Sequence, residues 1–228
     1  MKEKETIIIS LGGAIVVPDM PNFEFVTAFR DIILNWIKKD KKFVIIVGGG
    51  KTCRRYIEAL KNCIEATSEE LDWMGIYTTR LNAEFVRLSF GNSAYNQIVT
   101  DPHTIEDFNG DIIIGAGWRP GCSTDTDAVL VAKELNAKKI INISNIDYVY
   151  DSDPKINPNA IKFENISWSK YRSFISSKWT PGLNTPFDPI ASELAEKEGM
   201  EVAFMSGSNL SDLENYLNGN SFIGTTIK

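Results

Sequence analysis

The sequence predicts an α/β protein, a three-layer α/β/α sandwich whose central sheet is mostly parallel. Short runs rich in valine and isoleucine alternate with stretches whose apolar residues recur at helical spacing, a pattern typical of a parallel sheet covered by helices on both faces. Several of these runs end in glycine or polar clusters, and parallel sheets bind ligands beyond such strand ends. No low-complexity linker or fixed-period repeat interrupts the 228 residues, so we predict one domain, residues 1–228, with two functional halves.

The strand predicted at residues 43–47 ends in the most informative loop of the chain. Gly48, Gly49 and Gly50 follow it, and glycines can adopt positive φ and let backbone N–H groups approach an oxyanion. A helix starting near Thr52 would direct its partial positive charge to the same place, so phosphate is the expected ligand. The loop lacks the first glycine of a Walker A motif, because residue 45 is isoleucine.

The basic residues after these glycines have two explanations. Lys51, Arg54 and Arg55 would either bind phosphate or form a solvated helix face, and helical spacing does not place all three on one side.

The other elements follow from periodicity and from glycine and proline positions. Further strands are predicted at residues 6–10, 111–115, 139–143, 201–205 and 222–227, and helices at 24–39, 69–90, from about 125 to 135 and from 189 to 199. The apolar face of residues 24–39 fits either core packing or an oligomer interface.

Two aspartates precede predicted helices and have two interpretations each. Asp125 lies at the end of a glycine-rich loop, where its carboxylate would orient a metal-bound phosphate or a catalytic lysine. The other interpretation is that Asp125, or Thr124 in its place, caps the next helix. Asp188, in the segment PFDP, has the same two interpretations. Residues 147, 151 and 153 are also aspartates, and they fit solvated turn acids, a metal cluster, or ribose and magnesium contacts.

Composition excludes several classes of function. A net charge of -6 argues against a general binder of nucleic acid or anionic membranes. No apolar run has the length of a membrane span, and the polar N-terminus does not resemble a signal peptide, so we expect a cytoplasmic protein. Cys53, Cys63 and Cys122 lack metal-ligand spacing and are expected to be reduced, mostly buried thiols. A single histidine, His103, argues against histidine catalysis and a histidine-rich metal site.

Four segments together resemble the amino acid kinase fold and, within it, the archaeal-type uridylate kinases. They are SLGGAIV, VGGGKTCRRYI, GWRPGCSTDTDAV and SNIDYVYDSDP, and the resemblance extends along the whole chain to FDPIASELA and a terminal GTTI. It implies an ATP-dependent enzyme that uses Mg²⁺ and converts UMP and ATP to UDP and ADP. The acceptor would bind mainly to the N-terminal half and ATP mainly to the C-terminal half. Relatives form hexamers or dimers, so the resemblance also implies a homo-oligomer.

The resemblance also implies roles for individual residues. ATP would contact Gly12, Gly13, Gly50, Arg54, Ser144, Asp147, Tyr150 and Asp153. UMP would contact Gly49, Asp72, Trp118, Arg119, Pro120, Gly121, Cys122, Ser123 and Thr124. Asp125 and Asp188 fall where family members place the carboxylates that organise the reacting phosphates and magnesium.

Two departures from the family pattern matter. Many bacterial members carry a lysine immediately before the first pair of strand-end glycines, in the place of Ser10, so we take Lys51 as the candidate for the catalytic cation. The acceptor loop WRPGCST also begins differently from that of the archaeal relatives. Two alternatives therefore stay open: a kinase of the same fold acting on a carboxylate, carbamate or isoprenoid phosphate, and a non-catalytic binder of nucleotides or oxyanions.

Overall fold

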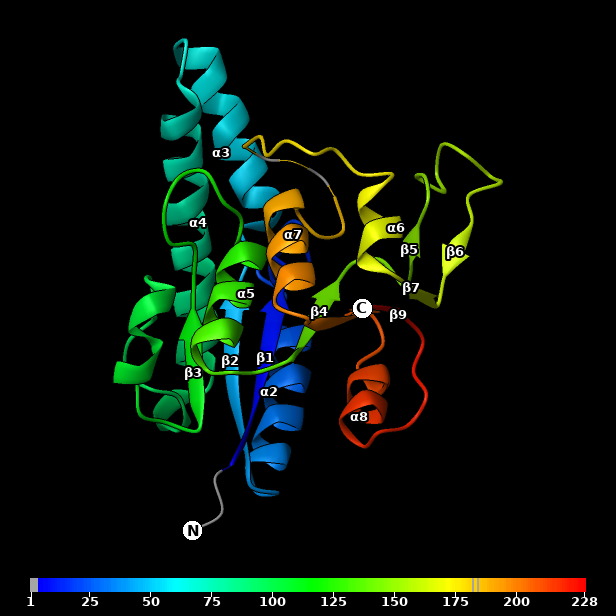
Figure 1. Cartoon of the computed structure of the whole chain (residues 1–228). Helices are drawn as coiled ribbons and strands as arrows, with labels where there is room; N and C mark the ends of the chain where they lie inside the picture. Colours follow the sequence, from blue (N-terminus) through cyan, green and yellow to red (C-terminus); the bar gives the residue numbers. More distant parts are fainter. Residues whose placement is uncertain (1–3, 182, 184) are drawn as a thin grey trace.

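The computed structural model describes residues 4–181, 183 and 185–228, and a seven-stranded sheet forms its centre (Figure 1). The strand order is β3-β2-β1-β4-β8-β9-β7. These strands span Glu5–Leu11 (β1), Lys41–Val47 (β2), Ile112–Gly115 (β3), Lys139–Ser144 (β4), Asn165–Ile166 (β7), Glu201–Ser206 (β8) and Thr225–Ile227 (β9). Among the described strands of this sheet, only β8 and β9 pair antiparallel; the other neighbours pair in parallel, which confirms the predicted mostly parallel sheet. Val149–Tyr150 (β5) and Lys162–Phe163 (β6) form a separate hairpin.

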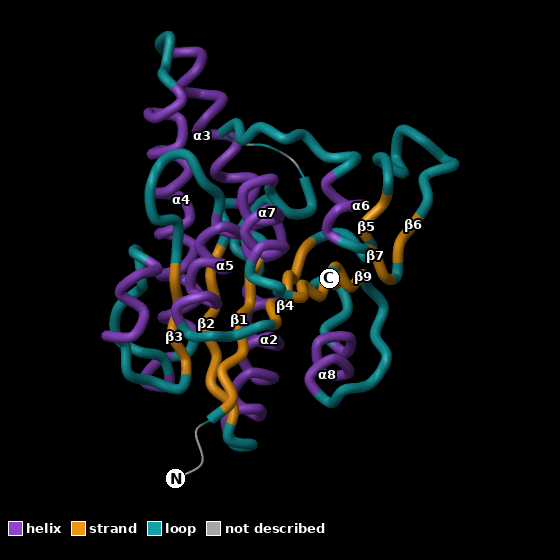
Figure 2. Tube along the Cα trace, in the orientation of Figure 1, coloured by secondary structure: helices purple, strands orange, loops and turns teal. Residues whose placement is uncertain are grey.

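Helices cover both faces of the sheet, as Figures 1 and 2 show. The helices are Gly13–Val16 (α1), Phe23–Ile37 (α2), Gly50–Cys63 (α3), Ser68–Ser89 (α4), Thr124–Glu134 (α5), Trp168–Arg172 (α6), Pro189–Lys197 (α7) and Ser211–Leu217 (α8), with 3-10 turns at Gly91–Ser93 (η1) and Pro102–Asp107 (η2). One core cluster joins the sheet to α2, α4 and α8, and a second joins it to α5, α6 and α7. The predicted three layers are present.

Alternation along β2 shows how one strand supplies both cores. Phe43, Ile45 and Val47 belong to the cluster that contains α2, whereas Val44 and Ile46 belong to the cluster that contains α5. All five side chains are buried, because successive residues of a strand point to opposite faces and both faces are covered. A strand in this position therefore reads as a continuous apolar run.

The apolar face of α2 packs into the core. Phe25, Phe29, Ile33 and Trp36 are all buried against the sheet, so the core interpretation of this helix holds and the oligomer interpretation does not. The side chain of Asn22 accepts a hydrogen bond from the backbone of Phe25 and begins the helix.

Some local predictions were wrong. The helix after the three glycines begins at Gly50 instead of near Thr52, and the cap of α5 is Ser123 rather than Thr124 or Asp125. The last strand is shorter than predicted, and the short elements α1, α6, β5, β6 and β7 were not predicted, because two to five residues carry too little periodicity. Among the described residues, no helix has the length and apolarity that crossing a bilayer requires.

Candidate active site

The glycine turns that follow β1 and β2 lie in direct backbone contact. A Cβ atom on Gly13 would lie 2.3 Å from both the Gly48 carbonyl oxygen and the Gly50 nitrogen, so no side chain fits there. Gly50 has a φ of +66°, and it is the one residue of the triplet that adopts the left-handed conformation. The backbone N–H of Gly12 donates to Ile143 at 2.8 Å, which brings the end of β4 to the same point.

Helix α4 holds the second glycine turn in place through a buried amide. The side chain of Asn82 donates hydrogen bonds to the carbonyl oxygens of Gly48 at 2.9 Å and Gly49 at 3.1 Å. Because these carbonyls are bound on the side of α4, the orientation of the turn is fixed before any ligand arrives.

Asp125 lies where β1, β4 and α5 meet. One of its carboxylate oxygens accepts hydrogen bonds from the Ser10 hydroxyl at 2.8 Å and from the Asn142 amide at 3.1 Å. Ser123 caps α5, since its hydroxyl accepts from the Asp125 backbone at 3.0 Å. The side chain of Asp125 is therefore not a helix cap, and it is left for contacts beyond the strand ends.

Asp188 has the first of the two roles considered for it from the sequence, that of a helix cap, and its second oxygen faces α5. One carboxylate oxygen accepts from the backbones of Ile190 at 2.7 Å and Ala191 at 2.9 Å, so Asp188 caps α7. The other oxygen accepts from the hydroxyls of Ser123 and, at 3.0 Å, Thr126. Through Ser123 and Thr126, α5 and α7 bring Asp188 next to Asp125.

A third carboxylate, Asp127, lies in the same part of α5 and is 1% exposed. Burial raises the pKa of Asp125 to about 7, and the negative charge of Asp188 adds to this effect. Burial likewise raises the pKa of Asp127 to about 8, and the charges of Asp188 and Asp125 contribute. Two buried carboxylates with raised pKa values, next to a third carboxylate, are typical of a functional site.

The loop at residues 117–122 is held from two helices. From α4, Thr79 accepts a hydrogen bond from the Gly117 backbone at 2.8 Å, and Asp72 accepts one from the Gly121 backbone at 2.8 Å. From α5, Asp127 accepts one from the Trp118 backbone at 3.2 Å. We call this segment the acceptor loop, after the role that the resemblance implies for it.

A cavity of about 160 Å³ opens between α3, α4 and the acceptor loop. Its lining includes several of the predicted site residues: Gly49, Gly50, Arg54, Asp72, Cys122, Ser123 and Thr124. Trp179 and Leu183, from the segment between α6 and α7, also line it. Trp118 and Arg119 are not among its lining residues; the Arg119 guanidinium lies 3.9 Å from the centre of the Trp118 ring.

The three basic residues of α3 separate into two groups. Lys51 and Arg55 both form ion pairs with Asp19 at 2.8 Å, and both are largely exposed. Arg54 lines the cavity. As the helical spacing predicted, the three do not share one side.

The residues implied in ATP binding lie around the end of β4 and the hairpin. Ser144 is the last residue of β4, next to Gly12, and its carbonyl oxygen accepts from Gly207 at 2.8 Å. Tyr150 lies in β5, and Asp147 and Asp153 are exposed in the adjoining loops. The Asp153 carboxylate accepts from the Lys155 backbone at 2.9 Å, as a turn acid does. No set of three histidine, cysteine or acidic residues in the described chain forms a metal-binding group.

Sequence reasoning missed Asn82, Asn142 and Asp127. Asn142 stands in an apolar strand and Asp127 among the apolar residues of a helix, and a polar residue in an apolar position was the available signal. Each is at most 4% exposed and hydrogen-bonded, which agrees with the rule that buried polar groups find partners.

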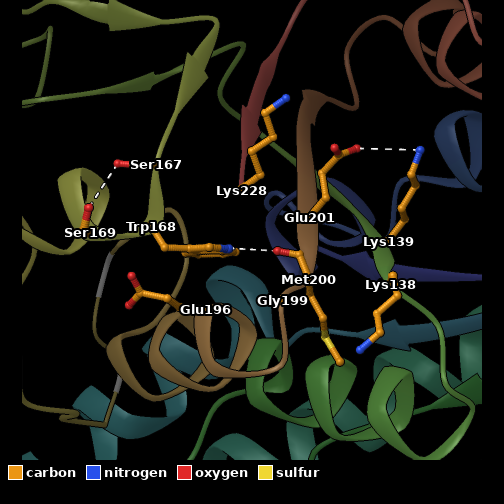
Figure 3. Close-up of a pocket in the computed structure, with 10 residues that line it drawn as sticks. All are labelled: Lys138, Lys139, Ser167, Trp168, Ser169, Glu196, Gly199, Met200, Glu201 and Lys228. Atoms are coloured by element: carbon orange, nitrogen blue, oxygen red, sulfur yellow. Dashed lines mark hydrogen bonds and ion pairs between the residues drawn. The ribbon is translucent and has the colours of Figure 1, made fainter.

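A larger cavity, of about 410 Å³, lies at the opposite end of the strands, where β4 and β8 begin (Figure 3). It is lined by Lys138, Lys139 and Lys228 and by the acids Glu196 and Glu201, with Trp168 donating to the Met200 carbonyl at 2.8 Å. Its charges are of both signs, and none of the predicted site residues lines it.

Comparison with known proteins identifies the family. The model of the amino acid kinase family matches residues 5–206. The chain belongs to the amino acid kinase family. Within this family it is 33% identical to a uridylate kinase of Methanospirillum hungatei, over 97% of this chain and 94% of that protein. It is 32% identical to a uridylate kinase of Pyrococcus abyssi, over 97% and 99% of the two chains.

Solved structures of amino acid kinase family members share the fold. The crystal structure of uridylate kinase from Archaeoglobus fulgidus superposes with a TM-score of 0.81 at 27% identity, covering 97% of this chain and 99% of that one. The UMP kinase of Bacillus anthracis, at 19% identity and a TM-score of 0.76, shows likeness of fold alone.

Proposed function

We propose that the protein is a UMP kinase, which transfers the γ-phosphoryl group of ATP to UMP and yields UDP and ADP. The observation that carries this proposal is the meeting of the Gly13 and Gly48–Gly50 turns with the Asp125 and Asp188 carboxylates at one edge of the sheet. The choice of UMP is supported by relatives named uridylate kinase that match nearly the full length of the chain.

The polar cavity supports a nucleotide rather than an isoprenoid as acceptor. Arg54, with its fixed positive charge, and Asp72 lie in its lining, together with the hydroxyl-bearing Ser123 and Thr124. The hydrocarbon chain of an isoprenoid would leave these polar groups without hydrogen-bond partners, which costs free energy.

Transfer to UMP needs positioning and charge neutralisation more than a strong base. A phosphate oxygen of UMP is already deprotonated near neutral pH, so it can attack the γ-phosphorus in line while the bond to the ADP oxygen breaks. Glycine N–H groups and Arg54 would neutralise the developing charge, and Lys51 is the candidate for the catalytic cation. Asp125 and Asp188 would organise the reacting phosphates and Mg²⁺.

The residues present fit a nucleoside triphosphate. No side chain fits where the two turns touch. Gly12, Gly13, Gly50 and Arg54 would hold phosphates, with Ser144, Asp147, Tyr150 and Asp153 toward the nucleoside. Mg²⁺ would be carried by the phosphates with Asp125 or Asp188 beside it, and it would supply charge neutralisation.

The same proposal includes the organisation of the chain. The N-terminal half would bind the acceptor and the C-terminal half ATP within one domain, in a cytoplasmic homo-oligomer, a dimer or hexamer. Exposed apolar residues on α4 support an oligomer: Tyr77, Leu81 and Leu88 are 61%, 68% and 61% exposed. Sedimentation of the wild-type chain and of Leu81→Lys would test this, because an α4 interface predicts a smaller species for the variant.

A coupled assay of ADP release tests the activity. The panel of acceptors would be UMP, CMP, dUMP, acetylglutamate and isopentenyl phosphate, each with ATP and Mg²⁺. We expect turnover with UMP above all others. If none of the nucleotides is phosphorylated, the proposal is overturned.

Asp125→Asn is the matched variant for this assay. Asparagine keeps an oxygen for Ser10 and Asn142, so the fold is retained, while kcat should fall by roughly 10²-fold or more. A folded, fully active variant would show that Asp125 takes no part in the chemistry.

A further inference from the structure

We propose that Asp127 is a positioning residue that sets the acceptor loop, residues 117–122, and thereby the affinity for the acceptor but not for ATP. The inference rests on the proposed function, because it assigns this loop to the acceptor. Nothing in the family resemblance assigned a role to Asp127, and it does not line the cavity.

The contacts of Asp127 point to the loop. One carboxylate oxygen accepts the backbone N–H of Trp118 at 3.2 Å, and the other lies 3.9 Å from the Cys122 thiol. These two contacts hold both ends of the segment from Trp118 to Cys122. Asp72 binds the Gly121 N–H from α4, so the loop is suspended between two carboxylates on different helices.

Packing alone does not explain an aspartate at this position. Asp127 is 1% exposed on a helix whose neighbouring residues Ala128, Val129 and Val131 are fully buried and apolar. A carboxylate there is desolvated and lies near Asp125 and Asp188, which repel its charge. An apolar residue would avoid both costs, so the hydrogen-bond acceptor facing the loop is the function that an aspartate adds.

The two clamping carboxylates have different access to the ligand. Asp72 lines the cavity and has one oxygen not engaged by the Gly121 N–H, so it can touch the acceptor directly. Asp127 lies behind the loop and can act only through Trp118 and Cys122. Its loss should therefore loosen the loop, and with it the contacts from Cys122, Ser123 and Thr124, without removing a group that touches substrate.

The test compares Asp127→Leu with Asp127→Asn. Asparagine retains an oxygen that can accept from the Trp118 N–H, whereas leucine is close in size and has none. We expect Asp127→Leu to raise the KM for UMP by about tenfold, with the KM for ATP within about twofold, and Asp127→Asn to stay within about threefold of wild type. Equal changes in both KM values, or equal effects of the two substitutions, would overturn the proposal.

Asp212→Leu is the control for a purely structural effect. Asp212 is also a buried carboxylate, 5% exposed, that accepts a backbone N–H, from Ile223 at 2.8 Å, but it lies in the first turn of α8, away from the cavity. We expect it to lower the Tm as Asp127→Leu does and to leave the KM for UMP unchanged. A rise in that KM equal to the one in Asp127→Leu would show that general destabilisation is the cause.

Hydrogen exchange of the ligand-free protein separates this inference from the proposed function. In Asp127→Leu, the hydrogen-bonded amides of Gly117, Trp118 and Gly121 should exchange at least about tenfold faster than in wild type and in Asp212→Leu. If they do while wild type phosphorylates no nucleotide, the proposed function fails and the clamp on the loop stands. Unchanged exchange would refute the clamp whatever the activity.

Discussion

The hydroxyl of Ser10, near the end of β1, donates a 2.8 Å hydrogen bond to the carboxylate of Asp125 at the start of α5. The remaining partner of that oxygen, the Asn142 amide, is also neutral, so the described hydrogen bonds of the Asp125 side chain bring no positive charge to it. Many bacterial family members place a lysine at the position of Ser10. Here no lysine charge offsets the effect of burial, which is the main cause of the raised pKa of Asp125.

The stability of the ligand-free protein should fall as the pH rises from 5 to 8. An unfolded aspartate titrates near 3.8, whereas Asp125 in the folded protein titrates at about 7. Between these values the folded state binds the extra proton, so the free energy of unfolding decreases with pH, by about 1–4 kcal/mol for this group.

Thermal unfolding at pH 5 and pH 8 measures this effect. In Asp125→Asn the loss of stability between the two pH values should be smaller, because only one buried acid with a raised pKa, Asp127, remains to titrate. An equal loss in wild type and variant would contradict the raised pKa of Asp125.

Lys51 should matter for transfer and Arg55 should not, although both pair with Asp19. We expect Lys51→Met to lower kcat by roughly 10²-fold, because the chain has no lysine at position 10 to supply the charge. Arg55→Met removes the same kind of ion pair, and steady-state kinetics should place it within about threefold of wild type. Similar kcat values for both variants would remove Lys51 from the mechanism and leave Arg54 as the cation of this helix.

Gly13→Ala should disrupt the site through steric overlap. The new Cβ atom would lie 2.3 Å from backbone atoms of Gly48 and Gly50, and neither can move without separating β1 from β2. We expect a loss of about 1–3 kcal/mol or more in the free energy of unfolding, measured with urea, and loss of activity. Gly110→Ala is the matched control, since its nearest atoms would lie 3.6 Å away, and it should behave as wild type.

Replacement by phenylalanine should destabilise the protein at Trp168 and have little effect at Trp179. The indole N–H of Trp168 donates to the Met200 carbonyl at 2.8 Å (Figure 3), so Trp168→Phe should cost about 1–3 kcal/mol. The N–H of Trp179 is buried and has no hydrogen-bond partner in the part of the chain that the structure describes. Trp179→Phe removes an unpaired donor, and calorimetry should show a change of less than about 1 kcal/mol.

Periodicity and composition were sufficient for much of this protein. The alternation of apolar runs with helical patterns predicted the layers and the mostly parallel sheet, because each pattern reports which faces of an element must be buried. The position of Gly48, Gly49 and Gly50 at a strand end predicted the place of the candidate site, because the carboxyl ends of parallel strands meet at one end of the sheet.

Tertiary structure alone decided which side chains meet there. The sequence could not separate a helix cap from a site residue at Asp125, since the choice depends on Ser123 taking the cap and on Ser10 and Asn142 arriving from two strands. It gave no reason to connect Asp127 with Trp118, because that bond depends on the path of a loop. Such contacts join segments far apart in the chain, and local sequence does not determine how close these segments lie in space.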